Sequence, residues 1–117
     1  INMAITQLYA VSETVSTTEW SFTTDTAGPD ADTTDGVFQG FFDVSALANG
    51  DTFRFRVYEK TQAASTQRLI YEAVLTNAQH EPIFVTPSLI LLHGWDMTWL
   101  KVAGTDRLID GSIRQVA

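Results

Sequence analysis

The stretch Phe53-Arg54-Phe55-Arg56-Val57-Tyr58-Glu59-Lys60 decides the fold class. Apolar and polar side chains alternate along it, so the phenylalanines and Val57 fall on one face and the arginines, Tyr58 and Lys60 on the other. A period of two residues is typical of a β-strand with one buried face. A second β-rich stretch, Arg68–Leu75, follows a small polar segment, and together the two predict an antiparallel hairpin with a longer loop.

Seven further segments combine β-branched, aromatic and aliphatic residues, and turn residues separate them. Glycine, asparagine and aspartate, which tolerate a positive φ, cluster at Gly28-Pro29-Asp30, Asn49-Gly50-Asp51 and Gly104-Thr105-Asp106. The additional predicted strands are 5–11, 20–23, 37–42, 83–85, 89–93, 95–102 and 108–116. About nine short strands predict one all-β domain over residues 1–117, an antiparallel β-sandwich or jelly roll. Helix is predicted only as a single turn at 44–48.

The composition limits the classes of partner. The 117 residues include no cysteine, so neither a disulfide nor a thiolate metal site is available. A formal net charge of −7 argues against nucleic acid, because binding to phosphates requires clustered lysine and arginine. The longest apolar run, Leu89–Leu92, is far shorter than the ~20 residues of a membrane helix, so no membrane partner is predicted. Met3 is expected to be the native start, with Ile1 and Asn2 non-native or encoded upstream.

Charge is distributed unevenly along the chain. The first 53 residues hold eight acids and neither lysine nor arginine, whereas residues 54–117 hold seven bases and six acids. Such an asymmetry indicates more about partners than about chemistry. Four of the acids lie in a predicted long loop, 24–36: Asp25, Asp30, Asp32 and Asp35. Their spacing departs from the EF-hand pattern, which favours a solvated acidic surface over a Ca²⁺ site.

The bases form a stripe on the predicted hairpin. Arg54, Arg56 and Lys60 share the polar face of its first strand, and Arg68 begins the second. Such a stripe is either the solvated outer face of a sandwich or a pairing surface for acids of the same or another copy. Both alternatives stay open. We predict interaction roles for these four bases and for the acidic loop as a complementary surface.

The aromatic and histidine residues suggest no specific chemistry. Trp20, Trp95 and Trp99 are candidates for a platform that binds a sugar ring, but Trp95 and Trp99 share the parity of Met97. That pattern favours a core or an apolar interface, and we predict an apolar contact for these two. His80 and His93 lie beside no plausible serine nucleophile. No catalytic residue, cofactor, metal site or enzyme activity is predicted.

Several motifs of the second half resemble a group of small proteins encoded by tailed bacteriophages and environmental phage genomes. The resemblance runs from about Thr18 to the end of the chain. The motifs that carry it are Arg56-Val57-Tyr58-Glu59-Lys60, Thr66-Gln67-Arg68, Pro87 through His93-Gly94-Trp95-Asp96-Met97-Thr98, Ala103-Gly104-Thr105-Asp106-Arg107 and Ser112-Ile113-Arg114. The group carries no catalytic residues. One departure is Gly111, where relatives place an aromatic residue, and it predicts lost burial in the last strand.

The resemblance implies a virion component assembled in the host cytoplasm. Small all-β virion proteins of this length often decorate capsids as trimers. We therefore predict a capsid decoration or cement protein that binds the major capsid protein, stabilises the head and associates with itself as a homotrimer. The segment Met3–Val11 is a candidate to add as a strand to a partner sheet. The alternatives are a tail or fibre module that binds a receptor or carbohydrate, and a neck or tail adaptor.

Overall fold

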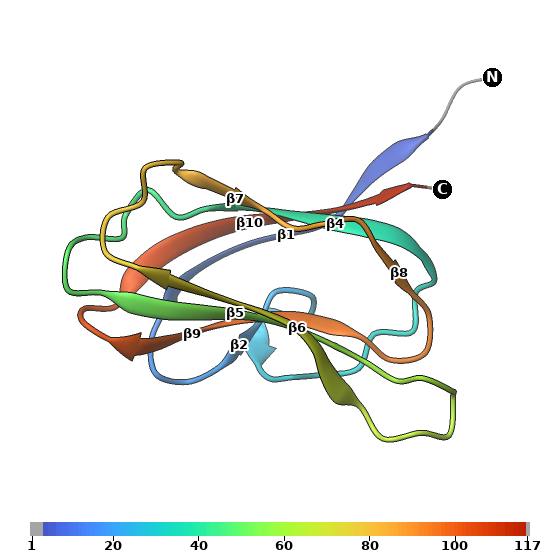
Figure 1. Ribbon diagram of the computed structural model, residues 1–117. Coiled ribbons are helices and arrows are strands. Elements are labelled where there is room, and N and C mark those ends of the chain that lie inside the picture. The colour runs from blue at the N-terminus through green and yellow to red at the C-terminus, as the bar shows by residue number, and fades with distance from the viewer. Residues whose placement is uncertain (1–3, 117) are drawn as a thin grey trace.

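The computed structural model describes residues 4–116 and consists of two antiparallel β-sheets packed face to face (Figure 1). The expected start at Met3, with Ile1 and Asn2 before it, lies outside these residues. The ten strands are β1 (Ile5–Val15), β2 (Trp20–Ser21), β3 (Thr26–Ala27), β4 (Gly36–Asp43), β5 (Thr52–Glu59), β6 (Arg68–Thr76), β7 (Ile83–Val85), β8 (Leu89–Leu91), β9 (Asp96–Ala103) and β10 (Arg107–Val116). The predicted β-sandwich is confirmed, and the jelly-roll assignment within that class stays a prediction.

One sheet, named sheet A, has the order β1-β10-β4, and the short strands β7 and β8 both pair with β4. β7 pairs with the Phe41–Asp43 half of β4 and β8 with the Gly36–Phe38 half. Buried Thr86 joins the two short strands, because its backbone N–H donates to Gly40 O at 3.0 Å while its Oγ1 accepts from Gly40 N at 2.9 Å. The result is one edge built from two collinear pieces.

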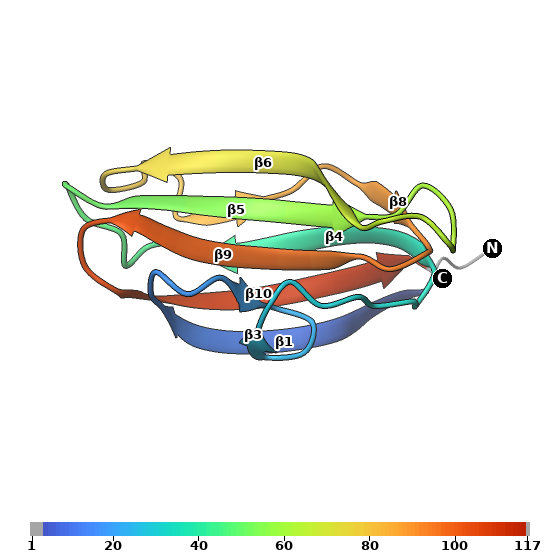
Figure 2. The same ribbon diagram turned by 90° about the horizontal axis from the view of Figure 1, so that it is seen from below.

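The other sheet, sheet B, has the order β3-β2-β9-β5-β6. Its β5 and β6 are the predicted hairpin, and Figure 2 shows them beside β9. In the register, Phe55 lies opposite Ala73 on the inner face and Arg56 lies opposite Glu72 on the outer face. The alternation read from the sequence is therefore the inside–outside alternation of this sheet.

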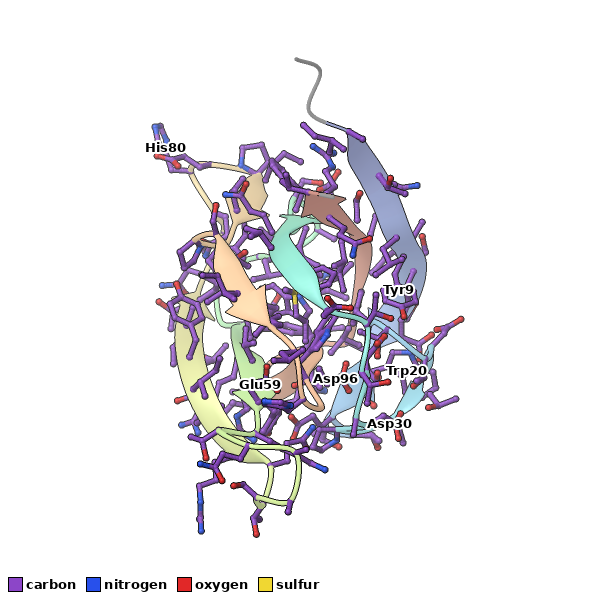
Figure 3. The ribbon with its side chains drawn as sticks, turned by 90° about the vertical axis from the view of Figure 1, so that its right-hand side faces the viewer. Tyr9, Trp20, Asp30, Glu59, His80 and Asp96 are labelled. Carbon is purple, nitrogen blue, oxygen red and sulfur yellow. The ribbon has the colours of Figure 1, made fainter. Side chains whose placement is uncertain are left out.

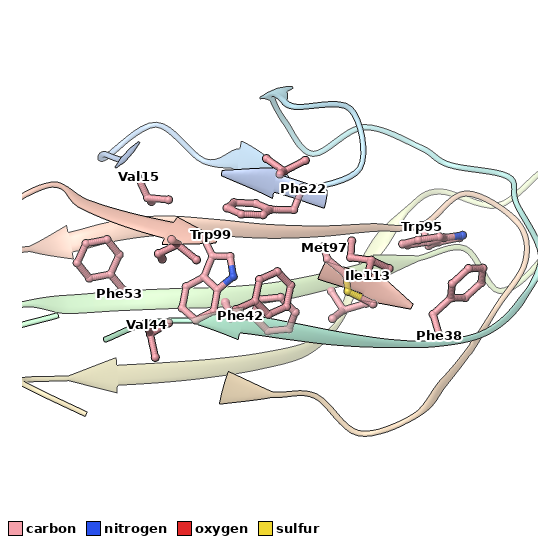
Figure 4. Close-up of a cluster of buried hydrophobic side chains, with 14 of the residues drawn as sticks. Val15, Phe22, Phe38, Phe42, Val44, Phe53, Trp95, Met97, Trp99 and Ile113 are labelled. Atoms are coloured by element: carbon pink, nitrogen blue, oxygen red, sulfur yellow. The ribbon is translucent and has the colours of Figure 1, made fainter. Parts of the chain in front are cut away.

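Aromatic rings fill the space between the sheets (Figure 4). The ring of Trp99 lies 5.2 Å from that of Phe55 and 5.6 Å from those of Phe42 and Phe84. Trp95 closes one end of the core, with its ring 4.5 Å from that of Phe38. Tilted and edge-on ring pairs at these distances stabilise a core beyond the area that they bury.

Two details differ from the sequence predictions. The segment 44–48, predicted as a single helical turn, is a hydrogen-bonded turn and not a helix. Leu47 N–H donates to Val44 O at 3.1 Å, and no helical hydrogen bonds follow. At Gly111 a Cβ would lie 2.7 Å from the Phe22 ring and 2.9 Å from the Phe42 ring. These two rings occupy the volume of the missing side chain, so the burial predicted to be lost is supplied by its neighbours.

Within residues 4–116 there is no helix of the length and hydropathy that crossing a membrane requires.

Candidate interaction surfaces

The acidic loop between β3 and β4 is fixed to sheet B by one buried carboxylate, Asp96 at the start of β9 (Figure 3). Asp96 is 0% exposed and accepts from Ser21 Oγ at 3.0 Å and Thr23 Oγ1 at 2.9 Å. The backbone N–H groups of Asp30 and Met97 each donate to it at 2.8 Å. Burial raises the pKa of Asp96 to about 6, and the four donors oppose that rise. The carboxylate is therefore a clamp that holds β2 and the loop together.

Three of the four predicted acids, Asp25, Asp30 and Asp32, each have separate hydrogen-bond partners. Asp25 accepts from Trp20 Nε1 at 2.9 Å, and Asp30 accepts from Thr24 Oγ1 at 2.5 Å and Thr26 Oγ1 at 3.0 Å. The carboxylate of Asp32 accepts from the Tyr9 hydroxyl, while its backbone exchanges hydrogen bonds with that of Trp95 at 2.8 and 2.9 Å. These carboxylates thus serve as local caps and bridges.

The described residues contain no group of three or more His, Asp or Glu side chains placed to hold a metal ion. The loop is also less irregular than predicted, because β3 and the Asp32–Trp95 bridge lie within it. Asp35 is exposed, and among the four predicted acids it alone has a carboxylate that accepts no hydrogen bond within residues 4–116, although its backbone O accepts from Gln115 Nε2 at 2.8 Å.

On the basic stripe, Arg56 pairs with acids of its own chain. Its guanidinium lies 3.2 Å from Glu19 and 2.8 Å from Glu72, and these contacts raise its pKa further above the usual range. Glu19 also accepts from the hydroxyls of Tyr58 and Thr98, each at 2.6 Å. This network joins an acid of the first half of the chain to a base of the second half within one copy.

The other three predicted bases form no ion pair within residues 4–116. Arg54 is half-buried on β5, and its Nε has no hydrogen-bond partner there. Lys60 and Arg68 line a shallow hollow of about 490 Å³ beneath the hairpin loop. The stripe is therefore divided into one arginine held in ion pairs and three bases in no ion pair within residues 4–116, although Glu59 lies opposite Arg68 and lines the same hollow.

Trp95 and Trp99 are 0% exposed and lie inside the core. The parity shared with Met97 correctly placed both tryptophans on one apolar face of the strand. In the fold that face is buried, so neither ring can contact a partner. The Trp95 indole N–H donates to Thr34 O at 2.8 Å, so it too is used internally. The prediction that these two tryptophans lie at an interface is wrong for the folded chain because both rings are enclosed by the two sheets.

The two histidines lie apart. His80 is exposed in the β6–β7 connection, far from the Asp96 region in Figure 3. His93 lies in the β8–β9 connection, where its backbone N–H donates to the Glu59 carboxylate at 3.3 Å. Glu59 also accepts from Leu92 N at 2.6 Å, so this acid fixes the backbone that leads into β9.

The outer face of sheet A, which the sequence interpretation did not single out, carries most of its apolar side chains uncovered. We name the outward residues of β1, β10, β4, β7 and β8 the A face. The exposed or half-exposed apolar residues on it are Ile5, Val37, Phe41, Ile83, Val85, Ile90, Leu108 and Val116. The available signal was the strand 37–42, in which Val37 and Phe41 share the parity opposite to the buried Phe38 and Phe42.

Two long edge strands are unpaired along one side. β1 bonds only to β10, and β6 bonds only to β5, among the strands of the described chain. β6 spans nine residues and exposes three large apolar side chains: Leu69 at 47%, Ile70 at 49% and Val74 at 51%. The predicted edge segment Met3–Val11 lies in β1 from Ile5 onward and is paired with β10 on one side, and Met3 lies outside the described residues.

Comparison with protein-family models, with curated proteins and with solved structures finds no match to this chain.

Proposed function

We propose that this chain is a bacteriophage virion structural protein, a capsid decoration or cement protein that binds the major capsid protein. The observation that carries the proposal is the β6 edge. Along its nine residues, the backbone N–H and C=O groups that point away from β5 are left unpaired among the described strands, beside three exposed apolar side chains. Edges of this kind accept a strand from a partner, and proteins that remain single usually cover or charge them.

Two further features support an assembly role. The resemblance of the motifs to small phage-encoded proteins implies a virion part. The hollow next to β6 is lined by Lys60, Arg68 and Glu59, and neither base forms an ion pair within residues 4–116, so both remain to pair with an acidic segment of a capsid subunit beside the added strand. The edge would supply affinity and the two bases would set the register of that strand.

The direct experiment is mass spectrometry of purified virions of the phage that encodes the chain. A decoration protein is expected in many copies per particle, and its absence from virions would refute the proposal. Reconstitution on undecorated heads then tests the edge. Val74→Lys with Leu69→Lys is expected to lower head occupancy at least tenfold, because charges on an edge oppose strand addition.

The matched control is Val102→Lys on β9, which is exposed to a similar extent as Leu69 but does not lie on an edge strand. It is expected to bind heads as the unmodified protein does. Equal loss in both variants would indicate a general effect of charge rather than a role of the edge. Binding only as a ring at the portal vertex would indicate a neck or tail adaptor instead.

A further inference from the structure

We infer that the A face is a self-complementary surface on which a second copy of this chain docks about a two-fold axis that passes over Ser112. This contact is separate from the β6 edge and does not rest on the virion role. The outward side chains of β10 form an ordered row across the middle of this face. In the register with β1 and β4, the outward positions read Leu108, Asp110, Ser112, Arg114 and Val116.

About Ser112, opposite charges lie at equal distances along the strand, and so do apolar residues. An acid and a base lie two positions to either side of it, and an apolar residue lies four positions to either side. A two-fold axis in the plane of the interface, perpendicular to β10 and over Ser112, places Arg114 of each copy over Asp110 of the other. The same rotation places Val116 over Leu108. Isologous contacts require this kind of self-complementarity.

Arg114 and Asp110 do not pair within one copy. They are four residues apart on one strand, which separates them by about 13 Å, and no ion pair joins them. Asp110 also accepts no hydrogen bond from a side chain of residues 4–116 and is exposed. Within residues 4–116 Arg114 and Asp110 thus lack a counter-charge, and Asp43 on β4 lies opposite Asp110 as a second outward acid in no ion pair.

The Arg114 side chain is already ordered for such a contact. Its guanidinium carbon lies 3.8 Å from the centroid of the Phe41 ring, and its Nε donates to Ser112 Oγ at 3.2 Å. Ser112 Oγ in turn donates to Gln7 Oε1 at 2.6 Å. Because stacking fixes the guanidinium before the partner arrives, less side-chain entropy is lost on docking.

The surroundings of this charged row are apolar and large enough for a stable contact. Val37, Phe41 and Val116 line a hollow of about 160 Å³ beside Arg114, and Ile83 extends the apolar surface along β7. The sandwich measures 41 × 36 Å across its two longer axes. A stable interface buries about 800 Å² on each partner, and a face of this extent can supply it.

The test uses the unmodified chain and two charge reversals. The unmodified protein is expected to form dimers in sedimentation equilibrium, and a monomer at every concentration up to the millimolar range would overturn the inference. Arg114→Asp and Asp110→Arg, each alone, place like charges opposite one another twice. Each is expected to weaken dimerisation at least about tenfold.

The decisive sample is the mixture of the two variants. In a mixed pair, the aspartate introduced in one copy faces the arginine introduced in the other, and the native Asp110 faces the native Arg114. Heterodimers are therefore expected from two chains that are separately monomeric. Circular dichroism and thermal unfolding verify that both variants are folded. A mixture that stays monomeric overturns the two-fold contact. A closed ring of three or more copies formed by the unmodified chain also overturns it, and would agree with the trimer implied by the resemblance.

The matched controls are Arg68→Asp on β6 and Asp25→Arg in the β2–β3 turn, which make the same charge changes at exposed positions of sheet B, away from the A face. Both are expected to dimerise as the unmodified chain does. If they weaken dimerisation as strongly as the A-face reversals, net charge rather than this surface controls association. Loss of the dimer with retained head binding, or the reverse, separates this inference from the decoration role.

Discussion

On the outer face of sheet B, Arg56 lies between Glu19 and Glu72, whereas on the outer face of sheet A, Arg114 lies on the Phe41 ring and forms no ion pair with any acid of residues 4–116. Sheet B is also partly covered, because Asp96 holds the acidic loop against it through the backbone N–H of Asp30. The two faces are built from strands with the same alternation. Their difference separates charges that are paired within one copy from charges left unpaired on an apolar surface, and the proposed dimer uses the second kind.

Removal of the Asp96 carboxylate should release the acidic loop from sheet B and produce the largest loss in free energy of unfolding. Asp96→Ala leaves two hydroxyl and two backbone donors without their acceptor, and the expected loss in free energy of unfolding is about 3 kcal/mol or more. Urea denaturation measures it. Asp110→Ala on the uncovered face is the control and should change stability by less than about 0.5 kcal/mol. Similar losses in both would mean that Asp96 is not a clamp.

The same carboxylate predicts how stability depends on pH. Its pKa is about 6 in the folded chain and about 3.9 when unfolded, so the folded state binds more protons between these values. The free energy of unfolding should therefore rise by up to about 3 kcal/mol as the pH falls from 7 to 4. Asp51 acts in the opposite direction, because Arg107 lowers its pKa to about 2, but only below about pH 4.

Thermal unfolding across this pH range measures the effect. Asp96→Asn has no ionisable group, so its stability should stay nearly constant between pH 4 and 7 whatever its absolute value. A slope that persists in this variant would assign the pH dependence to another group.

Replacing Arg56 and Arg114 separately by methionine compares the two outer faces directly. Arg56→Met removes two ion pairs on a partly exposed side chain, so a loss of about 1 kcal/mol is expected, and it should shrink at high salt. Arg114→Met should cost less than about 0.5 kcal/mol, because no ion pair is lost. Denaturation in low and high salt measures both. Equal losses in free energy of unfolding for the two variants would mean that the ion pairs of Arg56 do not distinguish the outer face of sheet B from the A face.

The smallest stability effect is expected from Val85→Lys on the A face. This half-exposed side chain lies opposite Phe41, and its replacement should change the free energy of unfolding by less than about 0.5 kcal/mol. Dimerisation should nonetheless weaken, since a charge enters the apolar part of the surface. Val74→Lys on β6 is the counterpart, and sedimentation should show no loss of dimer for it.

The sequence allowed the strands to be predicted because the alternation at Phe53–Lys60 is a local property. Strand ends and the two-residue strands β2 and β3 were less predictable, because two residues are too few to show an alternation of apolar and polar side chains. The face of Trp95 and Trp99 was also predictable from parity. Whether that face is a core or an interface depends on what the other sheet places against it, and this information is not local.

The candidate site was only partly predictable for the same reason. The pairing of Arg56 with Glu19 joins residues 37 positions apart and depends on how β2 lies on β9. Asp96 was missed, although an acid between Trp95 and Met97 in an apolar strand was a signal, because a buried acid requires several donors. The apolar A face was likewise visible as Val37 and Phe41 alternating with two buried phenylalanines.

The pairing of Ile5 with Val116 has a consequence for the folding rate. β1 and β10 are neighbours at opposite ends of the sequence, so forming their ladder closes nearly the whole chain into a loop, which makes the contact order high. Antiparallel partners lie roughly 5 Å apart, so a short turn joining the two strands would make them a local hairpin. A circular permutant opened in the exposed loop at 61–64 should therefore refold faster while keeping both faces of the sandwich.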